Sequence, residues 1–428
     1  MVLWMVFGSA AIAGTAAEPC YGHSAENRIS SDHFWVEWND GVITPNRAPR
    51  LLEAAEAARE AYLGWGWSLT DEPIVVYLSS ANGEGISGLT RTALCGGLPV
   101  PIIDLFVGSY DREDAAAVLT HEVAHAVQYA DMGAYLDSVT SWLWWMEGTA
   151  TWLTVRAVGD RDSYNWAASG YLVHPEFPLS WGVEGYIDPA AASHLYGTAL
   201  LAETVDEQLG MEALRATWAW GAERSGEALR IDDAIAGIGG DFNSFWAQFL
   251  ARVATKHFGE ALAIEADPVA QFVIDQLPAS VASVPLTAPR YFGMNLIRIE
   301  PSALRRGAVQ LHFSGDSAVT WDLVVARADA EGLLDYVRVP VENGVGEGWI
   351  HDANDRTSWV VASPRGLGPS STPGWAYTLD LERIRDPGPM DGRVVVREAP
   401  GGCEHSPTRH PLGISAMLAL GWMRRRRA

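Results

Sequence analysis

The sequence predicts an α+β fold, and three features of its hydrophobic patterning carry that prediction. Two short runs rich in β-branched and aromatic residues, at 34–38 and 74–78, predict strands, with a helical stretch near 51–63 between them. Residues 195–260 have a mostly helical pattern. From about residue 290, short β-rich runs are separated by Gly, Pro and Asn. We therefore expect an α+β domain with a helical lobe, followed by a small β-sandwich.

Within these regions the most apolar runs mark the expected core. The helical lobe is expected to pack through residues 199–202 and 245–250 and to close over a cleft. The sandwich strands are expected at residues 309–313, 321–325, 359–361 and 377–380. Residues 264–289, which hold prolines, alanines and serines without clear periodicity, are expected to form a linker between the two domains.

The composition of the chain indicates which partners and which location to expect for the protein. The chain has 428 residues, a formal net charge of -23 and a single lysine, Lys256. Such an excess of negative charge would repel phosphates, so we expect no nucleic-acid partner. An acidic surface of this kind favours a soluble and exported protein.

A five-residue motif, His121-Glu122-Val123-Ala124-His125, points to metal chemistry. On a helix, residues four apart differ by only ~40° around the axis and ~6 Å along it, so both histidines can ligate one ion. Glu122 projects differently and would reach a metal-bound water as a base. The other face of the helix is expected to join the core through Leu119, Val123, Ala126, Val127 and Ala130.

A second segment supplies a third ligand. Glu147 is the only charged side chain between Asp137 and Arg156, in a stretch with four tryptophans. A lone buried carboxylate costs several kcal/mol unless a cation or several donors meet it, so Glu147 is expected to complete the metal site. The alternative is a glutamate that points into solvent from a first helical turn. Gly148 removes a side chain and is expected to let this helix approach the motif helix closely.

A rival third ligand stays open at Asp131. Another large class of zinc proteases takes its third ligand six residues after the second histidine, with a glycine midway that turns the chain. Here Asp131 and Gln128 occupy those positions, and Gln128 lacks the conformational freedom of glycine. The helix is therefore expected to continue through Gln128, and Asp131 is the second choice.

With these residues the chain resembles the gluzincin metallopeptidases. The histidine motif followed by a distal Glu-Gly-x-Ala at residues 147–150 is typical of that group, and residues 118–128 are similar to a poorly characterised bacterial branch. The resemblance covers roughly residues 30–260. It implies one zinc ion on His121, His125 and Glu147, with Glu122 as general base.

The resemblance also implies a side chain that stabilises the oxyanion of the tetrahedral intermediate. The segment 193–198 is the best source, with Tyr196 as first choice and His194 as reserve. A packing role is the alternative for either residue. Residues 101–107 predict an edge strand, because a proline at its start is tolerated there. In the gluzincin fold such a strand pairs with an extended peptide, so a peptide or protein is the expected substrate.

The two ends indicate export. Residues 2–13 are apolar and residues 15–17 are small, which predicts a signal peptide at 1–17, although no Lys or Arg precedes the apolar stretch. In an oxidising compartment Cys20 and Cys95 could pair. The tail holds Cys403, a short apolar stretch at 411–423 and arginines at 424–427. It resembles the myxobacterial C-terminal sorting signal, which implies transient membrane contact and then display at the cell surface or release.

The expected organisation follows from these features. It comprises a signal peptide (1–17), a zinc metallopeptidase domain (18–263), a linker (264–289), a β-sandwich accessory domain (290–398) and a sorting tail (399–428). We expect a monomeric zinc peptidase, with endopeptidase preferred because no Gly-x-Met-Glu-Asn type motif precedes the histidines to hold a free amino terminus. The alternative is a surface-displayed binding or adhesion protein whose zinc site is structural or inactive.

Overall fold

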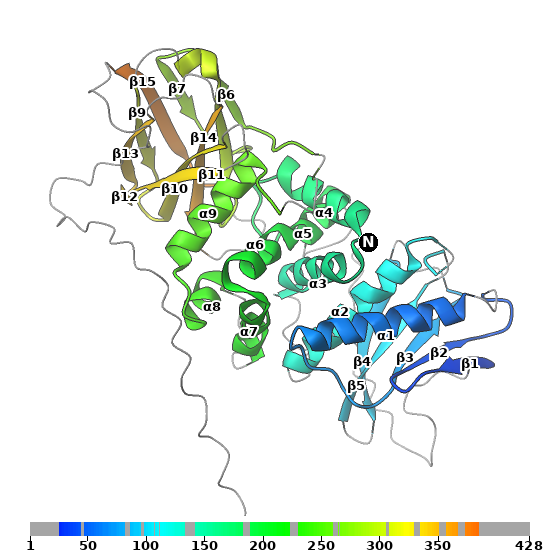
Figure 1. Cartoon of the computed structure of the whole chain (residues 1–428). Helices are drawn as coiled ribbons and strands as arrows, with labels where there is room; N and C mark the ends of the chain where they lie inside the picture. Colours follow the sequence, from blue (N-terminus) through cyan, green and yellow to red (C-terminus); the bar gives the residue numbers. More distant parts are fainter. Residues whose placement is uncertain are drawn as a thin grey trace, which may run out of the picture. The chain divides into compact units, whose positions relative to one another are not determined.

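The structure is a computed structural model that describes residues 25–384 apart from short gaps (Figure 1). The gaps fall at residues 44–46, 82–85, 96–97, 107, 111, 133–141, 183–188, 223–229, 260–263, 265, 305–307, 329–333, 351–356 and 367–372. The expected signal peptide, the sorting tail and the proposed Cys20–Cys95 pair lie outside the described residues and side chains. The described part is mixed α and β, as the sequence predicts, with three five-stranded sheets.

The first sheet has the strand order β1-β2-β3-β5-β4. Its strands are β1 (Asn27–Ser30), β2 (Phe34–Trp38), β3 (Ile74–Leu78), β4 (Gly88–Cys95) and β5 (Leu98–Leu105). Strands β2, β3 and β5 run parallel, whereas β1 and β4 pair antiparallel with their neighbours. The predicted strands at 34–38 and 74–78 are confirmed.

The predicted edge strand at 101–107 is wrong. It corresponds to β5, which lies between β3 and β4, so β4 forms the edge instead. Pro101 is tolerated in this interior strand because pairing with β3 begins one residue later, at Ile102. The hairpin partner β4 therefore covers the side of β5 that was expected to be free.

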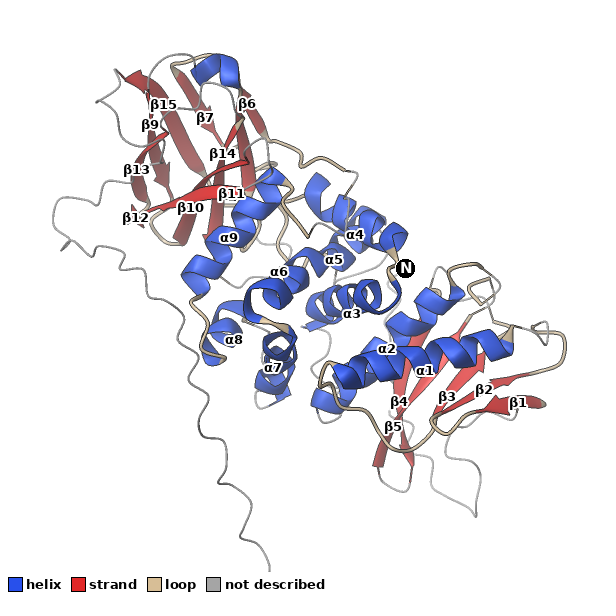
Figure 2. Cartoon of the chain, viewed as in Figure 1, coloured by secondary structure: helices blue, strands red, loops and turns tan. Residues whose placement is uncertain are grey.

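Two helices cover one face of this sheet (Figure 2). They are α1 (Ala48–Gly64), which connects β2 to β3 as predicted, and α2 (Ala115–Met132), which carries the histidine motif. The apolar face of α2 is buried at Leu119, Val123, Ala126 and Val127, as its periodicity predicts. The prediction for Ala130 on that face is wrong, because Ala130 is exposed, whereas its neighbour Tyr129 is buried.

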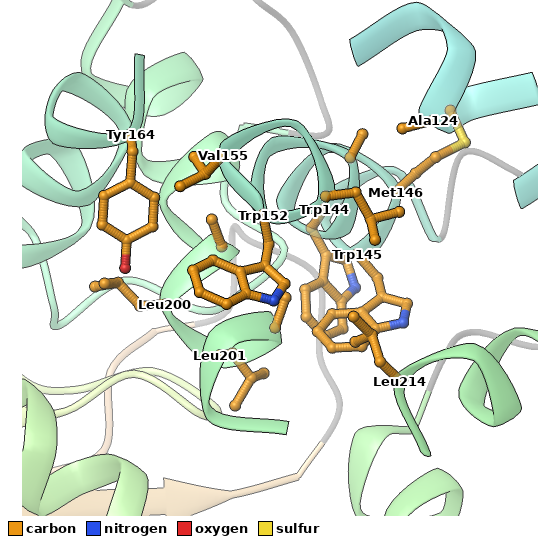
Figure 3. Packing of buried hydrophobic residues seen from close by; sticks show 14 of the residues in the cluster. Ala124, Trp144, Trp145, Met146, Trp152, Val155, Tyr164, Leu200, Leu201 and Leu214 are labelled. Atoms are coloured by element: carbon orange, nitrogen blue, oxygen red, sulfur yellow. The ribbon is translucent and has the colours of Figure 1, made fainter. Parts of the chain in front are cut away.

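The helical lobe follows and is confirmed as mostly helical. Its helices are α3 (Leu143–Val158), α4 (Arg161–Val173), α5 (Pro189–Gly197), α6 (Ala199–Leu209), α7 (Met211–Ala222), α8 (Ile231–Gly237) and α9 (Phe242–Thr255). Helix α3 is apolar almost all round because it lies inside the lobe and contacts α1, α2, α5 and α6. Trp144, Trp145 and Trp152 pack there beside Leu200 and Leu201 of α6 (Figure 3).

The C-terminal region is the expected β-sandwich, built from two five-stranded sheets with the orders β11-β10-β14-β8-β6 and β12-β13-β9-β15-β7. The strands are β6 (Phe272–Ile274), β7 (Ala279–Ala282), β8 (Asn295–Ile299), β9 (Ala308–Gly315), β10 (Thr320–Ala328), β11 (Leu334–Val339), β12 (Val341–Glu342), β13 (Val345–Ile350), β14 (Ser358–Arg365) and β15 (Tyr377–Ile384). Side chains of both sheets share one core cluster, which includes Leu323, Val360, Leu311 and Leu379.

The expected linker at 264–289 is wrong for part of its length. It contributes β6, which pairs with β8, and β7, which pairs with β15. Strands this short, with a proline between them, carry too little periodicity to be recognised locally.

The sandwich also shares a core with the helical lobe. Along β10, Leu323 and Val325 face the sandwich interior, whereas Val324 and Ala326 belong to the core that contains α9. Helix α9 contacts β10, β11 and β14. The continuous apolar run in β10 therefore reflects a strand buried on both faces.

Candidate metal centre

Two ligand candidates lie on one face of α2. His121 and His125 are one helical turn apart, and their rings meet edge to face with centroids 4.6 Å apart. His125 is buried, and the His121 side chain keeps 17% of its surface exposed. The motif spacing therefore gives the arrangement expected from it, with one histidine open to solvent.

Glu147 of α3 joins this pair. Its Oε2 lies 3.1 Å from His121 Nε2 and 3.5 Å from His125 Nε2. One donor atom from each of the three residues lies within 4.8 Å of the others, so the group could hold a metal ion. The structure thus brings together the three predicted ligands, and Glu147 is buried rather than directed into solvent.

The electrostatics of the group follow from burial and from its opposite charges. Burial alone would raise the pKa of Glu147, but His125 and His121 outweigh it and hold that pKa well below the usual range. Burial alone would lower the pKa of His125, yet the Glu147 carboxylate outweighs it and raises the pKa to about 9. The carboxylate and the imidazoles therefore favour one another's charged forms, and a bound cation would take the place of the imidazole protons.

The Glu122 carboxylate contacts β4 and is not part of the donor group. The Thr90 hydroxyl of β4 lies 2.7 Å from Glu122 Oε2 and 2.8 Å from the main-chain oxygen of the same residue. Gly88 leaves room for the carboxylate, since a Cβ there would lie 2.5 Å from Glu122 Oε1. Burial raises the pKa of Glu122 more than His125, His121 and Thr90 lower it.

The contacts from β4 to Glu122 could not be predicted from the sequence. Thr90 and Gly88 lie more than thirty positions before Glu122, in a segment without a motif. Only the alternation of Leu89, Thr90 and Arg91 could have indicated a strand, and it gives no pairing partner. Their proximity to Glu122 depends on how β4 and α2 pack.

The rival ligand Asp131 is engaged elsewhere. Helix α2 continues through Gln128 to Met132, as predicted from the absence of a turn-forming glycine. Six residues after His125, Asp131 Oδ2 accepts from Arg215 Nε of α7 at 2.9 Å. Asp131 is not part of the donor group, which Glu147 completes.

The two oxyanion candidates on α5 lie in different surroundings. The Tyr196 ring contacts His121, with centroids 5.8 Å apart, and also contacts Trp166 of α4, with centroids 5.6 Å apart. His194 is fully buried between Tyr171 and Trp181, with centroids 4.8 and 5.2 Å away. Tyr196 is thus the one whose ring adjoins a ligand candidate.

Gly148 does allow a close approach, but to a different partner from the one predicted. A Cβ there would lie 2.9 Å from the main-chain carbon of Thr198, between α5 and α6. The Thr198 hydroxyl donates to the Trp144 carbonyl of α3 at 2.7 Å. The glycine therefore fits α3 against the α5–α6 junction rather than against α2.

Comparison with known proteins does not identify the chain. No protein-family model and no curated protein sequence matches it. None of the described helices is long and apolar enough to cross a membrane.

Proposed function

We propose that the chain is a zinc-dependent peptidase of the gluzincin type, and that it acts as an endopeptidase. The observation that carries the proposal is the buried His121, His125 and Glu147 group with Glu122 beside it on α2. A structural metal site has no need of a further carboxylate next to its ligands. The Glu122 carboxylate instead accepts a hydrogen bond from the Thr90 hydroxyl, 2.7 Å away. A carboxylate held outside the donor group in this way suits the role of a base better than that of a ligand.

The donor set supports zinc in particular. Two imidazole nitrogens and one carboxylate leave a fourth position open, as in catalytic zinc sites. Ligands at ~2.0–2.1 Å in a tetrahedron are about 3.3–3.4 Å apart. The two separations from Glu147 Oε2, 3.1 and 3.5 Å, bracket that value.

In the proposed hydrolysis, the ion and the side chains of the protein have different roles. Zinc, when bound, would polarise the scissile carbonyl and lower the pKa of water. Glu122 would accept a proton from the water whose oxygen forms the new bond to carbon, and would pass it to the nitrogen as the C–N bond breaks. Tyr196 is the proposed donor to the oxyanion, because its ring adjoins His121.

The sheet offers a means of holding an extended peptide. Strand β4 pairs with β5 on one side and forms the edge of its sheet, and Thr90 near its middle bonds to Glu122. A peptide paired with this edge would run past the proposed base. In this proposal, therefore, the edge strand that pairs with the peptide is β4 and not the strand predicted at 101–107. Export stays a prediction, since both ends lie outside the described residues.

The variant Glu122→Gln tests the proposal. The purified protein is loaded with zinc, its metal content is measured, and hydrolysis of casein and of a broad peptide library is followed. We expect Glu122→Gln to retain one zinc and to lose hydrolysis by roughly 10²–10⁴-fold, because only proton transfer is removed. Glu113→Gln, at an exposed glutamate that precedes α2, is the matched control and should leave both unchanged.

Two results would contradict the proposal. Wild type that binds one zinc but cleaves nothing in the library would favour the binding or adhesion protein with a structural zinc site. Full activity of Glu122→Gln would remove Glu122 from the reaction.

A further inference from the structure

Gln128 lies on α2 three residues after His125 and is fully buried. Its side-chain amide has three hydrogen-bond contacts. Oε1 lies 2.9 Å from His125 Nδ1, and Nε2 lies 3.0 Å from the Met146 carbonyl and 2.7 Å from Thr149 Oγ1. One amide therefore connects a ligand candidate on α2 with two residues of α3.

The chemistry of these partners fixes the direction of each bond. A main-chain carbonyl only accepts, so the amide nitrogen of Gln128 must face Met146. The amide oxygen then faces His125 and can only accept, so Nδ1 of His125 must carry a hydrogen. In the neutral imidazole the lone pair then belongs to Nε2, the nitrogen 3.5 Å from Glu147 Oε2.

Thr149 is the last member of the hydrogen-bond network around Gln128. Its hydroxyl lies 2.7 Å from the Trp145 carbonyl, one turn earlier on α3, and donates to it. An oxygen lone pair of Thr149 is then free to accept from Gln128 Nε2. Both N–H groups and the oxygen of the amide are thus used, as a buried amide requires.

The two α3 partners flank the third ligand candidate. Met146 directly precedes Glu147, and Thr149 follows it by two residues. The bonds from Gln128 therefore hold α3 against α2 at the turn that carries the carboxylate.

We propose that Gln128 is a positioning residue that couples the two ligand-bearing helices. It orients His125 so that Nε2 faces the metal, and through Met146 and Thr149 it holds Glu147 at the distance that one ion needs. This inference rests on the metal site of the proposed function, but not on hydrolysis. A merely structural glutamine would stabilise the fold without affecting metal affinity.

The test compares metal binding with stability in the full-length protein. Metal is stripped with a chelator, zinc affinity is measured by competition with a chromophoric chelator, and thermal unfolding is recorded with and without zinc. The visible absorption of the cobalt(II)-loaded protein reports the coordination geometry. We expect Gln128→Leu to weaken zinc binding by roughly 10–100-fold and to change the cobalt spectrum.

A second variant keeps the test decisive if Gln128→Leu fails to fold. Thr149→Val removes one of the two bonds to α3 and preserves shape, so zinc affinity should fall by about fivefold, the equivalent of one hydrogen bond. Thr154→Val is the matched control, because its buried hydroxyl donates to Ala150 of the same helix. It should leave zinc affinity and the cobalt spectrum unchanged.

The outcomes separate the claims. If both test variants lower the thermal stability of the metal-free protein but bind zinc and cobalt as wild type does, Gln128 is structural and the inference is overturned. If wild type binds no zinc, the metal site fails and the inference falls with it. If wild type binds zinc and cleaves nothing while Gln128→Leu weakens binding, the peptidase proposal fails and the inference stands.

Discussion

Two buried histidines in this molecule have opposite acid–base behaviour. His125 of α2 lies beside the Glu147 carboxylate, and its pKa is raised to about 9. His194 of α5 lies between Tyr171 and Trp181, where burial and the nearby His174 lower its pKa to about 3. Burial disfavours the charged form of both, so the carboxylate makes the difference. The protonation state of a buried histidine thus depends on its partner: beside a carboxylate the charged form is favoured, and among aromatic rings the neutral form is favoured.

The largest expected effect comes from removing that partner. Glu147→Ala deletes one of three donors and, among the described residues, a carboxylate that lies close to both histidines. We expect zinc affinity to fall by on the order of 10³-fold or more, to the point that no zinc survives dialysis. Metal analysis by mass spectrometry after dialysis measures this.

Asp131→Ala is the control for that loss. Asp131 bonds to Arg215 of α7, so its removal should lower stability modestly and leave zinc bound. Zinc retained by Glu147→Ala and lost by Asp131→Ala would reverse the ligand assignment.

A second expected effect concerns the two tyrosines near these histidines. Tyr196 adjoins His121, whereas Tyr171 stacks on His194. As the proposed oxyanion donor, Tyr196→Phe should lower kcat by roughly 10²-fold with zinc affinity unchanged. Tyr171→Phe should leave kcat as it is. Steady-state kinetics on one cleaved peptide measures kcat for both variants. Equal kcat values would mean that Tyr196 has only a packing role.

The sequence predicted the donor group because its signals are local. The four-residue spacing of the histidines places them on one helix face, and the single charge of Glu147 stands out in an apolar segment. Strands β2 and β3 were predicted for the same reason, since their β-branched runs are short and well bounded.

What could not be predicted depends on packing between distant segments. The edge role of β4 follows from strand order, which residues 88–95 do not encode by themselves. Strand β7 pairs with β15, with Val281 opposite Leu379. The contact of Gln128 with Met146 and Thr149 arises only when α2 and α3 pack, so the sequence shows Gln128 only as a residue that lets the helix continue.

The smallest expected effect lies in the pH dependence that His194 gives to stability. Its folded pKa is about 3, against ~6.5 in an unfolded chain. Between these values the unfolded chain binds a proton that the folded chain does not, so the contribution is present above about pH 6.5 and is lost as pH falls. His194→Leu removes this titration. Relative to wild type, the variant should gain about 1 kcal/mol between about pH 7 and about pH 5.5.

Urea unfolding of both proteins at the two pH values measures this difference. His257→Leu, at an exposed histidine that follows α9, is the control and should show no such gain. An equal pH dependence in wild type and His194→Leu would mean that His194 is not held neutral by its aromatic surroundings. The difference in pKa between His194 and His125 would then need a cause other than the absence of a carboxylate beside His194.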